Sequence, residues 1–308
     1  MILVILILRK LKIGQIERID GPKSHLKKQG TPTMGGLIIL LGMLIVTCLI
    51  TYFLYKQGNI EIIEKMLPFL IATFGFGLIG FIDDFRKLVM QDTEGLRPTY
   101  KMLGLLVISV IFILYLKNVL HMGTETYIPI IKEYIRIPRS VYIIFEMFVM
   151  LGTTNAVNLT DGVDGLSTSV TTIIIACLTV IAAKIGCTEM VLFGTTVCGA
   201  NLAFLIFNMH PAKIFMGDTG SLLLGGVIAS MSLYLKMPLL LLVIALIPVL
   251  ETLSVILQVV HFKRTGNRMF KMAPLHHHFE LSGWNENKVV SVFSVITLLL
   301  CMVGLFII

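Results

Sequence analysis

Residues 35–55 read GGLIILLGMLIVTCLITYFLY and contain no Asp, Glu, Lys or Arg. A helix rises about 1.5 Å per residue, so about 20 apolar residues cross the roughly 30 Å hydrocarbon core of a bilayer. The run follows a polar segment that ends at Met34, and it stops at Lys56. This stretch therefore predicts a membrane-spanning helix, and the rest of the chain repeats the pattern.

Apolar runs of this kind recur from one end of the sequence to the other. We place candidate spans at residues 2–9, 35–55, 65–82, 101–120, 139–155, 166–184, 189–208, 220–236, 238–262 and 288–307. About ten spans of roughly 20 residues each use about 200 of the 308 positions and leave no room for a separate soluble domain. The prediction is an all-α, polytopic integral membrane protein with a single transmembrane domain over residues 1–308.

Two of these runs depart from a regular span. Run 2–9 is too short to cross a bilayer alone, so we expect a truncated or partial first helix. Pro248 and Glu251 lie inside run 238–262 and predict a broken or steeply tilted helix there.

The composition agrees with a membrane protein. Hydrophobic residues make up 56% of the chain and charged residues 14%, against roughly 45–50% and 25% in soluble domains. These values exclude a soluble globular protein and a disordered one. Most of the five Cys lie in apolar runs, where packing is their ordinary role. The net charge of +7 suits nucleic acid, anionic lipid head groups or a phosphorylated substrate.

Basic residues predict the orientation of the spans. The connections after the odd-numbered spans hold about twice as many Lys and Arg residues as the others, which places them in the cytoplasm. The polar segments with chemical character all fall on this predicted cytoplasmic side: 20–36, 83–84, 155–165, 208–221 and 263–284. On the opposite side, the alternation over 127–136 predicts a short hairpin.

Asp83 and Asp84 end the third span, where the negative end of a helix dipole makes adjacent carboxylates unfavourable. Arg86 and Lys87 could compensate them in a plain interfacial charge cluster. The alternative is a site for a divalent cation or for proton transfer, because paired carboxylates supply the hard oxygen ligands that Mg2+ prefers.

The segment 155–166 reads NAVNLTDGVDGL and combines amides, carboxylates and glycines without a Lys or Arg. Asp161 and Asp164 are three residues apart, so a helical turn would place both on one face. Asp164 or Ser167 could instead cap the next helix. A ligand site is the alternative, since glycines let the backbone bend and carboxylates accept hydrogen bonds from a base or a sugar.

The segment 208–221 precedes the eighth span. Asp218 could cap the helix that follows, or it could hold a metal ion. Phe215 lies three residues earlier and could stack on a planar base.

Segments 20–36 and 273–280 contain basic and hydroxyl side chains. Lys28 and Thr33 suit phosphate contacts near a helix start, although the lysines could simply anchor the chain to the leaflet. In the triplet His276 to His278, phosphate binding or proton transfer is a better interpretation than a zinc site. Glu146 and Glu251 lie within spans and need partners there.

The five segments 28–36, 83–84, 155–166, 215–221 and 273–280 occur together in this order and spacing. In this the chain resembles the phospho-N-acetylmuramoyl-pentapeptide-transferase family, within the polyprenyl-phosphate N-acetylhexosamine-1-phosphate transferase superfamily. The histidine triplet favours this family over its relatives. The short first span departs from the family pattern.

The resemblance implies an enzyme of the bacterial cytoplasmic membrane with about ten helices and an active site that faces the cytoplasm. It implies transfer of phospho-N-acetylmuramoyl-pentapeptide from UDP-MurNAc-pentapeptide to undecaprenyl phosphate, forming lipid I and UMP, with Mg2+ as cofactor. The implied partners are these two substrates and membrane lipid, with no nucleic acid, and an external hydrophobic face leaves room for a homodimer.

The resemblance also implies roles for individual residues. The matching catalytic positions are Asp83, Asp84, Asp218, His276 and His277, with Mg2+ at Asp218. The matching substrate-binding positions are Lys28, Thr33, Asn158, Asp161, Asp164, Asn208, Phe215 and His278.

Two mechanisms and two other functions stay open at this point. The lipid phosphate could attack the donor directly, with Asp83 orienting or deprotonating it, or the transfer could pass through a covalent aspartyl intermediate. A transporter or channel also has many spans, but its sites lie near the bilayer midplane and often at internal repeats. A noncatalytic lipid-binding protein would leave the acidic residues without a role.

Overall fold

The structure is a computed structural model that describes residues 30–88, 90 and 95–308. The predicted first span, 2–9, and Lys28 lie outside these residues. The long helices are α2 (Gly36–Lys56), α3 (Ile60–Leu88), α4 (Pro98–Asn118), α5 (Arg139–Thr160), α6 (Leu166–Lys184), α7 (Thr188–Asn208), α8 (Gly217–Tyr234), α10 (Leu246–Thr265) and α12 (Glu286–Phe306). Shorter elements are η2 (Pro238–Leu240), α9 (Leu241–Ile244) and α11 (Leu275–Glu280).

The fold prediction is confirmed in this part of the chain. Eight of the described helices are long and apolar enough to cross a membrane, so the protein is an all-α multi-pass membrane protein. The helix predicted at 220–236 is present as α8, although it is not one of the eight. The predicted break within 238–262 is also confirmed, since η2 and α9 precede α10 there. Pro248 lies in the first turn of α10, where its missing N–H costs no helical hydrogen bond.

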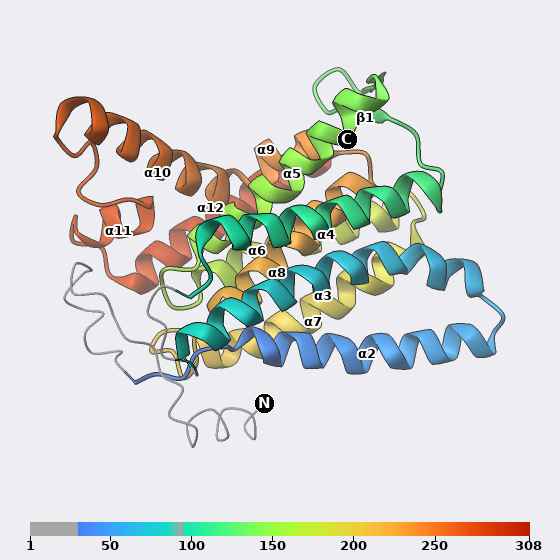
Figure 1. Ribbon diagram of the computed structural model, residues 1–308, viewed down its shortest axis with the longest axis horizontal. Coiled ribbons are helices and arrows are strands. Elements are labelled where there is room, and N and C mark those ends of the chain that lie inside the picture. Colours follow the sequence, from blue (N-terminus) through green and yellow to red (C-terminus); the bar gives the residue numbers. More distant parts are fainter. Residues whose placement is uncertain (1–29, 89, 91–94) are drawn as a thin grey trace.

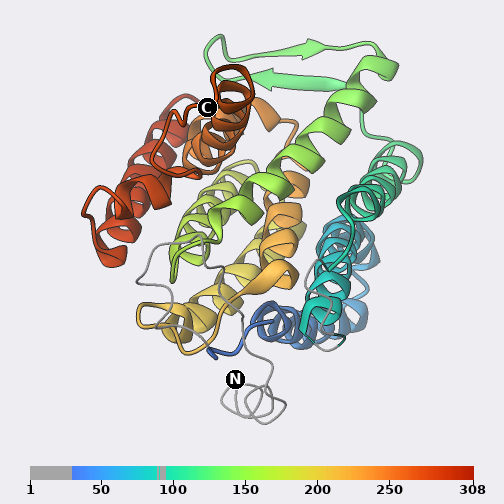
Figure 2. The same ribbon diagram turned by 60° about the vertical axis from the view of Figure 1, so that its left-hand side comes forward.

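The predicted hairpin is present as β1 (Glu125–Ile128) and β2 (Glu133–Arg136). The strands are antiparallel, and Glu125 pairs with Arg136 in the register. Figure 2 shows the hairpin across one end of the helix bundle, beside the start of α5.

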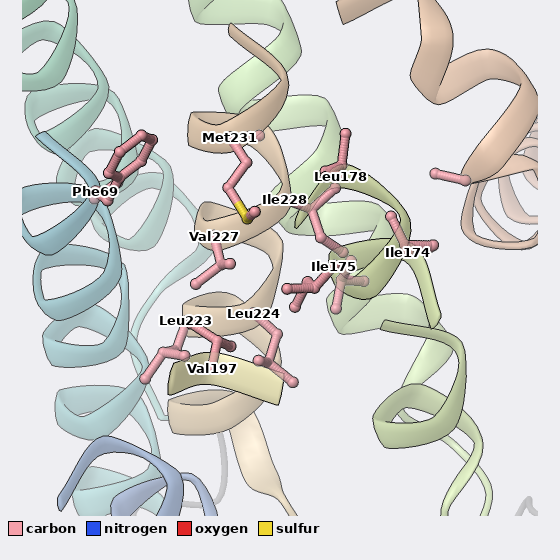
Figure 3. Close-up of a cluster of buried hydrophobic side chains, with 14 of the residues drawn as sticks. Phe69, Ile174, Ile175, Leu178, Val197, Leu223, Leu224, Val227, Ile228 and Met231 are labelled. Carbon is pink, nitrogen blue, oxygen red and sulfur yellow. The ribbon is translucent and has the colours of Figure 1, made fainter. Parts of the chain in front are cut away.

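Helix α8 forms the centre of the bundle, and α2, α3, α5 and α6 all pack against it (Figure 1). Every residue from Thr219 to Leu233 is buried. Figure 3 shows α8 side chains between Phe69 of α3 and the α6 cluster Ile174, Ile175 and Leu178. The outer helices bury much less of their surface, as expected for helices that contact lipid.

Glycines bring three helices together at one end of α8. A Cβ atom on Gly36 of α2 would overlap the backbone nitrogen of Gly220 in α8. A Cβ on Gly80 of α3 would overlap the carbonyl oxygen of Asp218. Small residues permit such close crossings of membrane helices. The contact at Gly80 places Asp83 and Asp84, one turn further along α3, beside the start of α8.

We expect Gly36→Ala to lower the thermal unfolding midpoint of the protein in detergent. The added methyl group has only backbone atoms to displace, and overpacking of this kind costs roughly 1–3 kcal/mol or more. Gly199→Ala is the matched control, because a Cβ at Gly199 in α7 meets no atom within 4 Å. Alanine there should keep or slightly raise the midpoint. Equal midpoints for the two variants would contradict the close contact between α2 and α8.

Candidate active site

Asp83 of α3 and Asp218 of α8 share two lysine ammonium groups. Lys87 Nζ lies 2.8 Å from Asp83 Oδ2 and 2.8 Å from Asp218 Oδ2. Lys101 Nζ, from α4, lies 3.4 Å and 3.1 Å from the same two oxygens. Asp83 Oδ1 also accepts a hydrogen bond from the Leu96 amide at 2.6 Å. The two carboxylates repel each other, and the ammonium groups offset this repulsion. The carboxylate pair of Asp83 and Asp218 therefore binds positive charge.

Asp84 faces the first turn of α8 and binds its free N–H groups. Its carboxylate accepts from the amides of Asp218 at 3.1 Å and Thr219 at 2.9 Å, and from the Thr219 hydroxyl at 2.6 Å. The positive end of α8 thereby compensates a carboxylate at the negative end of α3. The predicted conflict at this acidic pair is solved by α8 for Asp84 and by lysines for Asp83.

The alternative of Asp218 as a helix cap is wrong. Met216 is the N-cap of α8, and Asp218 lies inside the first turn with its side chain in the site. Asn158 of α5 donates from Nδ2 to Asp218 Oδ1 at 2.7 Å and to Ser221 Oγ at 2.8 Å. Helices α3, α4 and α5 therefore all contribute a polar side chain to Asp218.

The residues Asp161 and Asp164 point to different partners. They do not share one face of a helix, because α5 ends at Thr160 and the residues that follow form turns. A cap at Asp164 or Ser167 is wrong too, since the N-cap of α6 is Gly165, whose φ of +79° suits glycine.

Asp161 lies among other acids and accepts a hydrogen bond from the Gly217 backbone. Part of its surface stays accessible, yet protein atoms surround most of its carboxyl group. This burial, together with the nearby carboxylates of Asp218, Asp84 and Asp164, raises the pKa of Asp161 to about 8. At neutral pH most Asp161 side chains are therefore protonated in the metal-free protein.

Asp164 belongs to a cluster that joins two connections of the chain to the start of α12. His210 Nδ1 lies 3.0 Å from Asp164 Oδ2 and 3.5 Å from Glu286 Oε2, and the Ala212 amide donates to Asp164 at 3.1 Å. Ligand atoms of the three side chains lie within 4.8 Å of one another. One imidazole N–H between two carboxylates accounts for this geometry, so the cluster needs no ion to form.

Asn208 is buried and uses its amide within the protein. Its Oδ1 accepts from the Thr168 hydroxyl at 2.7 Å, and its Nδ2 donates to the Ile214 carbonyl at 3.0 Å. These bonds fix the connection between α7 and α8. Asn208 and Asp164 thus hold the segment that carries Phe215 and Asp218.

Residues 32–36 pair with this same segment. Phe215 donates from its amide to the Pro32 carbonyl at 2.8 Å and accepts from the Gly35 amide at 2.8 Å. Thr33 is buried beside Gly217, and the Phe215 side chain is half-buried. The pairing places Thr33 and Phe215 close to the start of α8.

The histidine triplet lies on α11, and its members have different surroundings. His276 is buried; its Nδ1 lies 3.2 Å from Glu251 Oε1, and a Cβ on Gly162 would overlap its Nε2. His277 Nδ1 lies 2.8 Å from Glu280 Oε2. His276 therefore borders the 161–164 turn, and Glu251 has the partner that its place in a span requires.

His278 has contacts within its own connection. Its Nδ1 accepts from the Lys271 amide at 3.2 Å, and its ring packs edge-on against Phe270.

Among the predicted site residues, the structure brings together Asp83, Asp84, Asn158, Asp161 and Asp218. His276 borders this group through Gly162.

The donor set around Asp218 suits a hard divalent cation. Two carboxylates converge there, and oxygen ligands are what Mg2+ prefers. The ammonium groups of Lys87 and Lys101 already bring positive charge to these oxygens. We therefore regard the oxygens of Asp218 and Asp83 as the best candidates for a metal site.

Comparison with known proteins identifies the family. The family model described as glycosyl transferase family 4 matches residues 66–236, and phospho-N-acetylmuramoyl-pentapeptide-transferase signature 1 matches residues 28–40. Curated proteins named phospho-N-acetylmuramoyl-pentapeptide-transferase from Clostridium perfringens (strain 13 / Type A), Clostridium botulinum (strain Eklund 17B / Type B) and Acetivibrio thermocellus are 48%, 49% and 47% identical to this chain. The alignments cover 98%, 96% and 97% of this chain and 92%, 88% and 88% of those proteins.

These matches define the class and then the family. More than half of the chain matches glycosyl transferase family 4, a class of transferases, and the fold is that of a multi-pass membrane protein. Within that class, the chain belongs to the phospho-N-acetylmuramoyl-pentapeptide-transferase family.

Proposed function

We propose that this chain transfers phospho-N-acetylmuramoyl-pentapeptide from its UDP carrier to undecaprenyl phosphate, forming lipid I and releasing UMP. We further propose that the whole chain is one transmembrane catalytic domain in the bacterial cytoplasmic membrane, with its site facing the cytoplasm. The names of the relatives support phospho-N-acetylmuramoyl-pentapeptide as the transferred group. The observation that supports the chemistry is the convergence of Asp83 and Asp218 with Lys87 and Lys101.

Charge neutralisation is the main task of such a site. A diphosphate and a phosphate monoester together bring about three to four negative charges, which the carboxylates alone would repel. Asp218, with Asp83, would hold Mg2+ in this proposal. When bound, Mg2+ neutralises the diphosphate and stabilises the charge that develops on departing UMP.

The two lysines have a second role in this proposal. Lys87 and Lys101 donate to the two carboxylates in the structure, and their ammonium groups would contact the phosphate oxygens of the bound donor. The lysines would then hold the donor close to the acceptor, which is the larger part of catalysis in phosphoryl transfer.

Asp83 and Asp84 take different parts. Both oxygens of Asp84 accept from the first turn of α8, so we assign Asp84 the positioning of Asp218. Asp83 faces the lysines, and we assign it the orientation or deprotonation of the acceptor. The lipid phosphate, with a second pKa of about 6, is largely dianionic at neutral pH and needs little activation. We therefore propose direct attack on the β-phosphorus of the donor rather than an aspartyl intermediate.

The remaining residues surround the donor in this proposal. Phe215 would stack on the base, with Asp161, Thr33 and Lys28 near the nucleoside and the diphosphate. The contacts of Asp164, Asn208 and His278 lie within the protein, so we assign them the positioning of the binding loops. His276 supports the 161–164 turn, and His277 contacts a substrate phosphate.

The function is tested by incubating the purified protein with UDP-MurNAc-pentapeptide, undecaprenyl phosphate and Mg2+. We expect UMP and lipid I in equal amounts, and neither product without Mg2+. Movement of a solute across sealed vesicles without UMP release would instead support a transporter. Binding of undecaprenyl phosphate with no product would support a noncatalytic lipid-binding protein.

Asp161 gives a prediction that depends on pH. At pH 7, below its pKa of about 8, Asp161 is mostly protonated, and a nearby divalent cation favours the charged form. We expect Asp161 to release up to about one proton as Mg2+ binds. Calorimetric titrations in two buffers of different ionisation enthalpy measure this number. Asp161→Asn should abolish the release, and an unchanged release in that variant would contradict the assignment.

A further inference from the structure

The connection between α4 and α5 is unusually basic for its side of the molecule. It lies at the opposite end of α4 from the active site, because Lys101 is in the first turn of that helix and Lys117 is in its last. Lys132, Arg136 and Arg139 follow within the hairpin and at the start of α5. Positive residues are normally sparse on the side opposite the cytoplasm. The basic residues of this connection are therefore candidates for binding an anion.

The structure gathers three of these cations around a single cavity. The cavity, which we call the hairpin cavity, has a volume of about 510 Å³ and lies between the end of α4, the hairpin and the start of α5. Lys117, Arg136 and Arg139 line it together with Gly123 and Thr124. Lys132 does not line it, although it belongs to the same hairpin.

Lys117 is held rigidly at the inner wall. Its Nζ lies 3.0 Å from Glu146 Oε1, donates to the Gly123 carbonyl at 3.1 Å, and lies 4.4 Å from the centre of the Tyr142 ring. Glu146 is buried and neutralises Lys117. The excess positive charge of the hairpin cavity therefore comes from Arg136 and Arg139.

The two arginines are exposed and available to a ligand. Glu125 is the residue opposite Arg136 in the hairpin, but its Oε2 lies 2.6 Å from Lys236 Nζ. Among residues 30–88, 90 and 95–308, no carboxylate forms an ion pair with Arg136 or Arg139. Two guanidinium groups beside one cavity form a binding place for a phosphate group, which arginine recognises through paired hydrogen bonds.

The surroundings of the cavity favour a lipid over a soluble anion. The hairpin exposes Ile130, Ile131, Tyr134 and Ile135, and Ile130 keeps 88% of its surface accessible. Exposed aliphatic and aromatic side chains beside cations are typical of segments that lie in the head-group region of a bilayer. We propose that the hairpin cavity binds the phosphate group of an anionic phospholipid in the leaflet opposite the active site.

The test compares lipids on the purified, delipidated full-length protein in neutral detergent. Native mass spectrometry measures binding of phosphatidylglycerol and phosphatidylcholine with identical acyl chains. We expect the wild type to prefer phosphatidylglycerol roughly tenfold or more, since each nearby cation adds about a factor of five. The double variant Arg136→Gln/Arg139→Gln should lose this preference. Lys132→Gln, which removes a charge from the same hairpin outside the cavity, should keep most of it.

Further measurements distinguish a lipid head group from a soluble phosphate as the ligand of the hairpin cavity. Inorganic phosphate at millimolar concentration should not displace phosphatidylglycerol, and displacement would overturn the proposal in favour of a soluble anion. An unchanged preference in the double variant would overturn it as well, as would an equal loss in Lys132→Gln. The double variant Arg136→Lys/Arg139→Lys should retain part of the preference. Because the cavity is remote from the active site, UMP release checks that each variant is folded.

Discussion

Asp218→Asn should reduce Mg2+-dependent UMP release by about a thousandfold or more. Asp218 is the carboxylate that Lys87, Lys101 and Asn158 all contact, and it is the best-placed metal ligand. Loss of one group that stabilises developing charge commonly costs a hundred- to a thousandfold, and loss of a metal ligand adds to this. The measurement is the initial rate of UMP release over a range of Mg2+ concentrations.

A control variant with the same change from acid to amide can be made on the opposite side of the molecule. Glu133→Gln makes the same change from acid to amide on an exposed residue of the hairpin, and it should leave the rate unchanged. Asparagine keeps the size of Asp218 and can still accept from Asn158, so the variant should fold and keep its thermal midpoint. Normal turnover by Asp218→Asn would remove Asp218 from the metal role.

Lys101→Gln should change turnover and metal binding in opposite directions. Its ammonium group occupies oxygens of Asp218 and Asp83 in the structure, so its removal should strengthen Mg2+ binding in the absence of substrate. The same change removes a charged contact to the donor phosphates, worth about 1.5–3 kcal/mol, or roughly ten- to a hundredfold in kcat/KM. Calorimetry gives the first quantity and steady-state kinetics the second.

The opposite signs make this variant informative. A residue with only a structural role would weaken both properties together. Lys184→Gln is the control, since Lys184 is exposed at the end of α6 and should affect neither property. Weaker Mg2+ binding by Lys101→Gln would show that the ammonium group does not compete with the cation.

The helices could be predicted from the sequence because a bilayer fixes their length. Each span needs about 20 apolar residues, and this requirement does not depend on which helices are neighbours. The break before α10 followed from Pro248, and the hairpin followed from the alternation over 127–136. The ends were less accurate: α3 extends to Leu88, beyond the span predicted at 65–82, and its last residues Asp83, Asp84 and Lys87 have partners in α4 and α8.

The contacts within the site could not be predicted in the same way. Asp83 and Asp84 are adjacent, yet one faces two lysines and the other faces the first turn of α8, and only the crossing of α3 and α8 at Gly80 decides this. Lys101 is the first residue of the predicted span 101–120. A single lysine at the start of an apolar run does not indicate which carboxylate it contacts. The contact between His210 and Asp164 joins connections that are far apart in the sequence.

The bond between Asp84 and Thr219 has a mechanical consequence for a protein in a fluid, changing membrane. Since Asp84 ties the end of α3 to the start of α8, the two helices must shift as one body when bilayer thickness varies. Helix α12 buries little of its surface, so it can tilt without separating Asp83 from Asp218. We therefore expect the distance between Asp83 and Asp218 to vary little with the fatty-acid composition of the membrane.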